Sequence, residues 1–239
     1  MSNLKRNGQL RWAPSYLRNR GQLTRAQKRA LRESWAEYGI TLQHDETLDL
    51  DTYFTQRGPL IIEIGFGRGD HLVQWAKARP DDRILGIEVH RPGLAAAILK
   101  LREEELDNVR LIRGDARLVL TDHLVGEIAD AMIVQFPDPW PKLGDEHRRL
   151  IQPGMAKTMS GRLKVGGYVQ LITDITTYAD HTKKVFQNAD GWEAVDSSPF
   201  LTQRPITSYE QKALEAGRPI IELGYRKSEP SATSTASKD

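Results

Sequence analysis

One segment restricts the possible folds of this chain more than any other. A short apolar run, LIIEI at residues 60–64, stops at the glycine-rich sequence GFGRGD. An uninterrupted apolar run of this length is typical of a parallel strand that is buried on both faces. Gly65, Gly67 and Gly69 allow the backbone to turn tightly and to approach a ligand closely. Because a helical pattern follows at 71–79, the segment predicts a strand–loop–helix unit whose loop binds a nucleotide-type cofactor.

Strand and helix patterns alternate along most of the remaining chain. The apolar runs that predict further strands lie at residues 83–89, 109–113, 129–136, 168–173, 192–195 and 220–225. Helical patterns lie at residues 24–35, 94–106, 153–163 and 178–188, and the glycine pair at 166–167 is interpreted as the end of the helix at 153–163. This alternation predicts the α/β class, with a Rossmann-like doubly wound, mostly parallel sheet.

The charge distribution divides the chain into unequal parts. Residues 1–32 contain nine Lys or Arg residues and no carboxylate, although the net charge of the whole chain is only +2. Such asymmetry is typical of an arm that meets a polyanion, and equally of a solvated basic tail. We expect a basic arm with a short helix at 1–40, the main domain at 41–227 and a disordered Ser/Thr/Ala-rich tail at 228–239.

The residues that the chain lacks disfavour several classes of function. It contains no cysteine, which removes disulfides, thiolate nucleophiles and Cys-ligated zinc and agrees with a cytoplasmic location. The six histidines are scattered without paired ligand spacing, so no metal is expected. We find no apolar run of about 18 residues and no apolar segment near the N-terminus, so neither a membrane span nor a secretory signal is expected.

Carboxylates accompany the ends of three predicted strands. Asp70 stands where the dinucleotide pattern has glycine, and an acid there suits a pyrophosphate poorly. Glu63, in an otherwise apolar strand, requires a partner such as the amino group of a cofactor. Glu88 is placed to accept both ribose hydroxyls, and Asp115 to reach an adenine amino group. The set predicts S-adenosylmethionine, with incidental surface acids around a glycine-rich turn as the alternative.

The fourth strand runs into the sequence FPDPWPK at residues 136–142. Three prolines in five positions continue neither a strand nor a helix, so they predict a rigid loop at the edge where the parallel strands end. The loop carries the carboxylate of Asp138, the indole of Trp140 and the ammonium group of Lys142. On spacing alone, a structural proline-rich turn around a packed Trp140 is the alternative.

Together these segments resemble the bacterial tRNA (guanine-N7-)-methyltransferases. The matching stretches cover roughly residues 20–226 in the family's order: EIGFGRGDHL, GIEVHRPG, IRGDA, FPDPWPK, HRRLIQP, ITD and RPITSYE. The combination of FPDPWP with the later RRL and QP is highly specific. The resemblance implies S-adenosylmethionine as the cofactor and transfer of its methyl group to N7 of a guanine in tRNA, with the variable-loop guanine at position 46 as the expected target.

The resemblance also implies roles for individual residues. The cofactor would be contacted by Glu63, Glu88, Asp115 and Asp138, and Asp138 would also be the catalytic residue. The substrate would be bound by Lys142, Asp174, Thr207, Ser208, Tyr209 and Glu210. The RNA would be touched by Gly144, Asp145, Glu146, His147, Arg148 and Arg149.

The stretch at residues 144–149 departs from the usual sequence of the family. The family's loop after FPDPWPK is usually strongly basic, whereas in this chain Asp145 and Glu146 largely offset two arginines. This composition weakens the local attraction for phosphate. The hypothesis that the N-terminal arm supplies positive surface for tRNA therefore gains weight.

The chemistry implied by the resemblance is consistent with the residues present. N7 of guanine has a free in-plane lone pair, so the enzyme's work is alignment and electrostatics, and a carboxylate such as Asp138 or Asp174 favours the positive charge that develops. Trp140 and Tyr209 are candidates to stack on the base, with a packing role favoured for Trp140.

Three alternatives remain at this point: a methyltransferase that acts on a different RNA or on a small molecule, a non-catalytic paralogue that binds RNA or protein, and, as a distant third, an NAD oxidoreductase. The oligomeric state is left open between a monomer and a homodimer.

Overall fold

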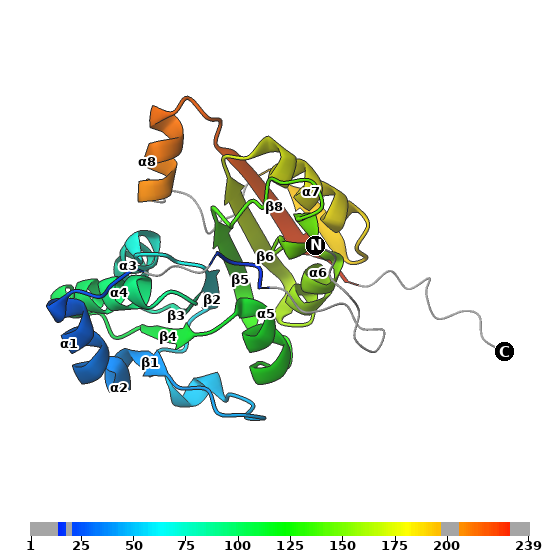
Figure 1. Ribbon diagram of the computed structural model, residues 1–239. Coiled ribbons are helices and arrows are strands. Elements are labelled where there is room, and N and C mark those ends of the chain that lie inside the picture. The colour runs from blue at the N-terminus through cyan, green and yellow to red at the C-terminus, as the bar shows by residue number, and fades with distance from the viewer. Residues whose placement is uncertain (1–13, 18–20, 197–205, 230–239) are drawn as a thin grey trace.

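The computed structural model describes residues 14–17, 21–196 and 206–229, and the described part contains one eight-stranded sheet with helices on both faces (Figure 1). Its strands are β1 (Gly39–Ile40), β2 (Leu60–Ile64), β3 (Arg83–Glu88), β4 (Val109–Arg113), β5 (Ala129–Gln135), β6 (Leu163–Thr173), β7 (Trp192–Val195) and β8 (Ile221–Lys227). The order across the sheet is β1-β4-β3-β2-β5-β6-β8-β7. The strands from β1 to β6 pair in parallel, and β8 pairs antiparallel with both β6 and β7. The predicted Rossmann-like, mostly parallel sheet is thus confirmed.

The strand order reverses beside β2. From β2 the chain moves outward through β3 to β4, then returns to place β5 on the other side of β2. Ligands of open α/β sheets bind outside the carboxyl ends of the strands at such a reversal. The glycine-rich sequence lies directly after β2, and FPDPWPK lies directly after β5, so the topology brings these two motifs to the same edge.

The helices follow the predicted alternation, with local differences. The larger ones are α1 (Arg25–Glu33), α3 (Asp70–Ala78), α4 (Arg91–Glu103), α6 (Pro153–Ser160), α7 (Thr176–Gln187) and α8 (Ser208–Glu215). Short helical segments are α2 (Trp35–Tyr38), α5 (Ala116–Leu118), η1 (Leu50–Thr52), η2 (Val119–His123) and η3 (Glu146–Arg148). No helix within the described ranges is long and apolar enough to cross a membrane.

One predicted boundary was wrong. Helix α6 ends at Ser160 rather than at Leu163, and the glycine pair at 166–167 belongs to β6 instead of closing the helix. The register between β5 and β6 shifts there, because Leu163 pairs with Ala129 whereas Tyr168 pairs with Ala131. Gly166 has a φ of 80°, so the glycine serves an irregularity in the strand.

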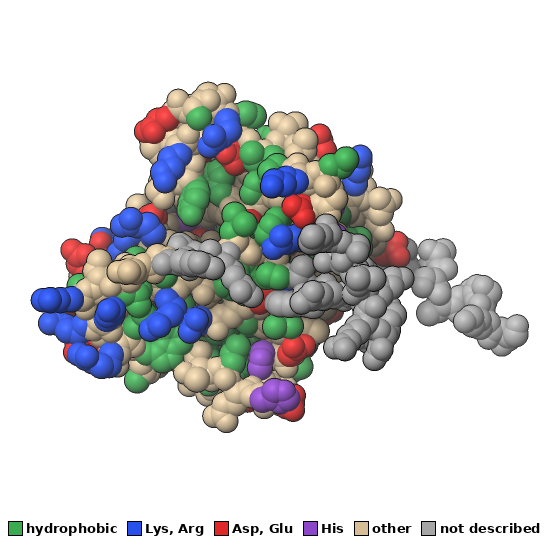
Figure 2. All heavy atoms as spheres, in the orientation of Figure 1, with side chains coloured by type: hydrophobic (Ala, Val, Ile, Leu, Met, Phe, Trp, Pro, Cys, Tyr) green, Lys and Arg blue, Asp and Glu red, His purple; other side chains and the backbone are tan. Residues whose placement is uncertain are grey.

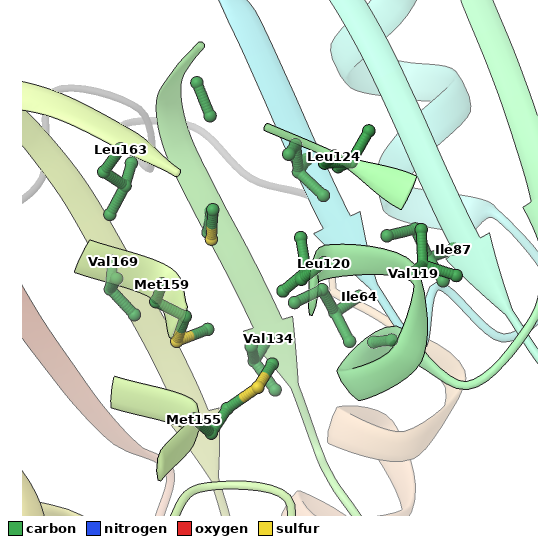
Figure 3. Packing of buried hydrophobic residues seen from close by; sticks show 14 of the residues in the cluster. Ile64, Ile87, Val119, Leu120, Leu124, Val134, Met155, Met159, Leu163 and Val169 are labelled. Atoms are coloured by element: carbon green, nitrogen blue, oxygen red, sulfur yellow. The ribbon is translucent and has the colours of Figure 1, made fainter. Parts of the chain in front are cut away.

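Buried apolar residues form one cluster on each face of the sheet. Figure 3 shows part of the first, which includes Ile64, Ile87 and Val134 of the sheet and Met155 and Met159 of α6; Val134 lies beside Met155, and Ile87 lies beside Val119. The second lies under α3 and α4 and contains Leu72, Leu94, Ile98, Ala30 and Tyr38. Each fully buried Leu or Ile contributes roughly 1.5–3 kcal/mol, so the strands that carry the site are held from both sides.

The basic helix α1 is fastened to this core. Thr24 and Gln27 form a reciprocal capping box at its first turn, which confirms the predicted cap at Thr24. Ala30 is buried in the second cluster, and Gln27 Nε2 donates to the carbonyl of Pro92 at 3.4 Å. Other cations of the predicted arm, Lys5, Arg6, Arg11, Arg18 and Arg20, lie outside the described residues, as does most of the predicted tail, at 230–239.

Candidate active site

The glycine loop after β2 has the conformation for which its glycines are needed. Gly65, Gly67 and Gly69 have φ values of 71°, 58° and 75°, in the left-handed region that other residues avoid. Helix α4 also approaches closely, since a Cβ on Gly93 would lie 2.2 Å from the carbonyl oxygen of Gly67. The first residue of α3, Asp70, forms an ion pair with Lys100 of α4. The loop is therefore held between two helices.

A cavity of about 660 Å³ lies against this loop, at the carboxyl ends of the central strands. Among the predicted site residues, those that line it are Glu63, Gly65, Gly67, Glu88, Asp115, Asp138, Thr207, Ser208 and Tyr209. The volume is within the usual range for a pocket that binds a small molecule. Among these predicted residues, the cavity joins positions up to 146 apart in the sequence, counted from Glu63 to Tyr209.

Glu88 has the most completely defined surroundings. Its Oε2 accepts from Gly67 N–H at 2.9 Å, and its Oε1 accepts from the N–H groups of Val89 and His90 at 2.7 and 2.8 Å. Burial raises the pKa of Glu88, and these backbone donors oppose the rise. A carboxylate offers about four acceptor positions, so one remains for a ligand hydroxyl while the backbone holds the group in place.

Glu63 is paired inside the protein, which the sequence did not suggest. Its Oε2 lies 3.0 Å from Nδ1 of His71, and both side chains are almost completely buried. A histidine of α3 therefore supplies part of the pairing that was expected from a ligand, while Glu63 also lines the cavity.

Asp115 caps the short helix α5 and carries an ion pair. Its Oδ1 accepts from Arg117 N–H at 3.0 Å, and its Oδ2 lies 3.0 Å from Arg117 Nη2. The carboxylate still lines the cavity, but Arg117 competes with any adenine amino group for it.

The loop after β5 holds its carboxylate by unusual backbone geometry. Phe136 and Trp140, on either side of the Pro137–Asp138–Pro139 sequence, have φ values of 48° and 45°. A residue other than glycine that is held at such a positive φ costs of order 1 kcal/mol or more, and such strain concentrates at functional sites. The packing that sustains it includes Trp140, which is 7% exposed and donates from Nε1 to the carbonyl of Ser15 at 3.0 Å.

The segment 14–17 crosses the cavity beside this loop. Ser15 and Tyr16 line the cavity, and Leu17 N–H donates to Asp138 Oδ2 at 2.6 Å. The ring of Tyr16 meets His90 edge-on at 6.0 Å. The start of the chain was predicted to meet RNA, and the structure places its described part over the proposed catalytic carboxylate.

The predicted substrate residues divide into two groups. Thr207 and Tyr209 line the cavity, and Tyr209 is 59% exposed and stacks on Phe136 with ring centroids 6.5 Å apart. Lys142, Asp174 and Glu210 do not line it. Asp174 is paired with Arg218 at 2.6 Å, and Glu210 is buried.

The Thr-x-x-Glu element also has a structural role that the sequence reasoning did not consider. Thr207 is the N-cap of α8, and its Oγ1 accepts from the N–H of Glu210 at 3.2 Å. A Thr followed three residues later by Glu is itself a capping signature, which predicts this helix. Helix α8 was not expected, although that signal for it was present.

Arg149, one of the expected RNA contacts, is engaged inside the protein. This side chain is 5% exposed, and its Nε donates to the carbonyl of Pro139 at 3.0 Å while its Nη1 donates to that of Thr177 at 3.3 Å. Arg148 is engaged too, with its guanidinium 3.3 Å from the ring centroid of Trp140. Arg149 therefore stabilises the loop by donating to the carbonyls of Pro139 and Thr177, and Arg148 stabilises it by covering the ring of Trp140.

Two polar residues of the cavity wall were missed. His71 Nε2 and both amide atoms of Gln135 are buried, line the cavity and have no hydrogen-bond partner in the described part of the chain. A buried polar group left without a partner costs about 1–3 kcal/mol, so a polar ligand that pairs with them is favoured. A sign of Gln135 was present in the sequence, since a glutamine ends the otherwise apolar run AMIVQ.

Solved structures with a similar fold are methyltransferases. The antibiotic-resistance methyltransferase Kmr superposes with a TM-score of 0.54 at 16% identity, covering 77% of this chain and 93% of its own. The 16S rRNA methyltransferase KamB superposes with a TM-score of 0.56 at 14% identity, covering 80% and 98%. At such identities the likeness shows the fold alone. With the cavity at the strand reversal, it defines the class of fold, a Rossmann-like open sheet with a ligand site at the carboxyl ends of its strands.

Sequence relatives are more specific. The family model described as "Putative methyltransferase" matches residues 57–223. A protein of Nitrosococcus oceani is 39% identical over 214 residues, which cover 90% of each chain. A protein of Halorhodospira halophila is 36% identical over 224 residues, which cover 91% of this chain and 96% of the relative. Both are named tRNA (guanine-N(7)-)-methyltransferase, and this chain belongs to that family.

Proposed function

We propose that this protein transfers the methyl group of S-adenosylmethionine to N7 of a guanine in tRNA. The observation that carries the proposal is the single cavity in which the glycine loop and Glu88 face Asp138 of the FPDPWPK loop. One wall has the features of a nucleoside site, and the other holds a carboxylate on strained backbone. The relatives' names supply the acceptor, tRNA guanine.

The residues of the first wall fit the cofactor. Glu88 accepts a ribose hydroxyl at the acceptor position that its backbone donors leave open. Asp115 accepts from the adenine amino group. The amino-acid end of the cofactor lies against Glu63, which is paired with His71, and against His71 Nε2 and the amide of Gln135, which are buried without partners in the described chain. When bound, S-adenosylmethionine supplies an electrophilic methyl group.

The residues of the second wall serve the base. N7 of guanine attacks with its own lone pair, so no side chain has to remove a proton first. The work of the protein is alignment of N7 with the methyl group and stabilisation of the positive charge that the ring gains. Asp138 lies at the cavity wall with a negative charge for this purpose, and its Oδ2 is oriented by the N–H of Leu17.

Tyr209 is the side chain that stacks on the target base. More than half of its surface is exposed, it lines the cavity, and Phe136 supports its other side. Base–aromatic stacking contributes about 1–3 kcal/mol. Trp140 is buried between Ser15 and Arg148, which favours the packing role. Lys142 and Asp174 contact the RNA outside the cavity. Because Asp174 is paired with Arg218, it contacts the RNA either through that arginine or after the ion pair has opened.

Two finer statements belong to the same proposal. The target nucleotide is the variable-loop guanine at position 46, as the family resemblance implies. The protein acts in the cytoplasm, as a monomer or a homodimer, on tRNA that has been transcribed and folded.

The test is transfer of labelled methyl groups to bulk tRNA, followed by nucleoside analysis. We expect 7-methylguanosine from the wild type and none from Asp138→Ala. Asp122→Ala is the matched control, because Asp122 is exposed on η2 and does not line the cavity. A label in another nucleoside redirects the proposal, and a wild type that makes no 7-methylguanosine overturns it in favour of a non-catalytic paralogue.

A further inference from the structure

A second, smaller cavity adjoins the first. It has a volume of about 390 Å³ and is lined by Gly21, Gln22, Leu23, Lys28, Val89, His90, Arg91, Pro92 and Arg113. His90 and Pro92 line both cavities, so the two spaces share a wall. Three cationic side chains and no carboxylate line the second cavity within the described residues. We call it the basic groove.

The fold assembles this groove from three separate elements. Lys28 comes from α1, Arg91 begins α4 and Arg113 ends β4. They meet because α1 packs on α4 through buried Ala30 and the hydrogen bond from Gln27 to Pro92. Figure 2 shows Lys and Arg side chains gathered over the α1 end of the molecule. No single sequence window contains the three cations.

These three cations are unpaired in the described part of the chain, and all three are exposed. Elsewhere on α1 the pattern is different, since Arg29 and Arg32 both lie within 3.4 Å of Glu33. Like charges that converge on one cavity repel each other, and an anion that enters the cavity offsets this repulsion. The arrangement therefore favours a ligand with negative charge.

We infer that the basic groove binds phosphates of the RNA backbone next to the target guanine. The inference rests on the proposed function and names where the substrate's backbone lies. A polymer whose base occupies the first cavity places its neighbouring phosphates across the shared wall, where His90 and Pro92 lie. Guanidinium groups such as those of Arg91 and Arg113 match phosphate oxygens with two parallel N–H donors.

The experiment measures binding of the full-length protein to tRNA as a function of salt. The groove variant is Lys28→Gln with Arg91→Gln and Arg113→Gln. Its matched control is Lys157→Gln with Lys183→Gln and Lys184→Gln on α6 and α7, which removes the same charge from the other face of the sheet. Each lost phosphate contact lowers the slope of log K against log salt by about 0.7–0.9, so the groove variant flattens it by about 2 to 3.

The outcomes separate this inference from the proposed function. We expect the groove variant to bind tRNA on the order of tenfold more weakly or worse, with S-adenosylhomocysteine binding unchanged in the absence of RNA. An unchanged slope in the groove variant, or an equal loss in the control, overturns the groove. Competition by inorganic phosphate as effective as that by RNA assigns it to a free anion instead. Failure of the wild type to make 7-methylguanosine overturns the function, while the flattened slope still establishes RNA binding.

Discussion

Two regions beside the cavity have basic residues, and they differ in how those residues are used. The loop at 141–149 contains Lys142, Arg148 and Arg149 together with two acids. Arg149 is buried on carbonyls, and Arg148 covers Trp140. The basic groove contains three exposed cations and no acid. The comparison shows that basic residues close together in the sequence can be engaged inside the protein, whereas cations from distant segments can gather, exposed, on one cavity.

Both regions adjoin the cavity that Asp138 lines, and loss of this carboxylate is expected to have the largest effect. Asp138→Asn keeps an oxygen for the N–H of Leu17 but removes the negative charge. We expect methyl transfer to fall by about a hundredfold or more, the scale of losing one preorganised electrostatic group. Affinity for tRNA should stay close to that of the wild type, because the groove is intact. Single-turnover rates and filter binding check this, and near-normal turnover contradicts it.

The loop side of the comparison is tested by Arg149→Met. The substitution leaves the carbonyls of Pro139 and Thr177 without their donor, so we expect the free energy of unfolding to fall by about 1–3 kcal/mol. Arg148→Met is the control and should cost less, about 0.5–1 kcal/mol, because it removes a partly exposed stacking contact. Urea denaturation measures both. A loss of RNA salt dependence in Arg149→Met at full stability would return this residue to the RNA surface.

The cofactor side of the cavity that both regions adjoin should respond to pH. Burial raises the pKa of Glu88 above its ordinary value, and the ionised carboxylate is the form that accepts a ribose hydroxyl. Cofactor affinity should therefore fall as the pH is lowered toward that raised pKa, earlier than for an exposed glutamate. Calorimetry with S-adenosylhomocysteine measures the fall, and Glu88→Gln should bind weakly with a flatter pH profile. The same profile in Glu88→Gln assigns the effect to another group.

The smallest expected effect comes from restoring charge to the 141–149 loop. Asp145→Lys replaces an acid by a cation beside the cavity, so tRNA should bind a few-fold more tightly at low salt, with a steeper salt slope by about one. Asp122→Lys on η2 is the control for net charge alone. If both variants gain equally, long-range attraction explains the result. If neither gains, the loop lies away from the RNA.

The strand-end residues were the most predictable part of the site. An apolar run followed by glycines, and acids at successive strand ends, predicted that Glu63, Glu88 and Asp115 line one cavity. This worked because parallel strands carry their ends to a common edge, whatever the details of packing. Asp174, the acid after β6, is paired with Arg218 and lies outside the cavity, and its substrate contact stays a prediction.

Contacts between distant segments could not be predicted in the same way. The segment 14–17 has no periodic pattern, yet Leu17 reaches Asp138 across 121 positions. Gln135 of β5 and His71 of α3 line the same cavity only because the fold brings these two elements together. Such encounters depend on three-dimensional packing, which a local sequence window does not contain.

The sequence by itself determined the class of fold, the cofactor loop and the family, because these depend on local patterns: apolar runs, glycines that permit positive φ and the prolines of FPDPWPK. Tertiary structure alone decided which charges are free. Arg149 is in a motif of the family but is buried, whereas Lys28, Arg91 and Arg113 come from three different segments and converge on one groove. The physical reason is that electrostatic attraction depends on distance and exposure in space, and neither follows from position along the chain.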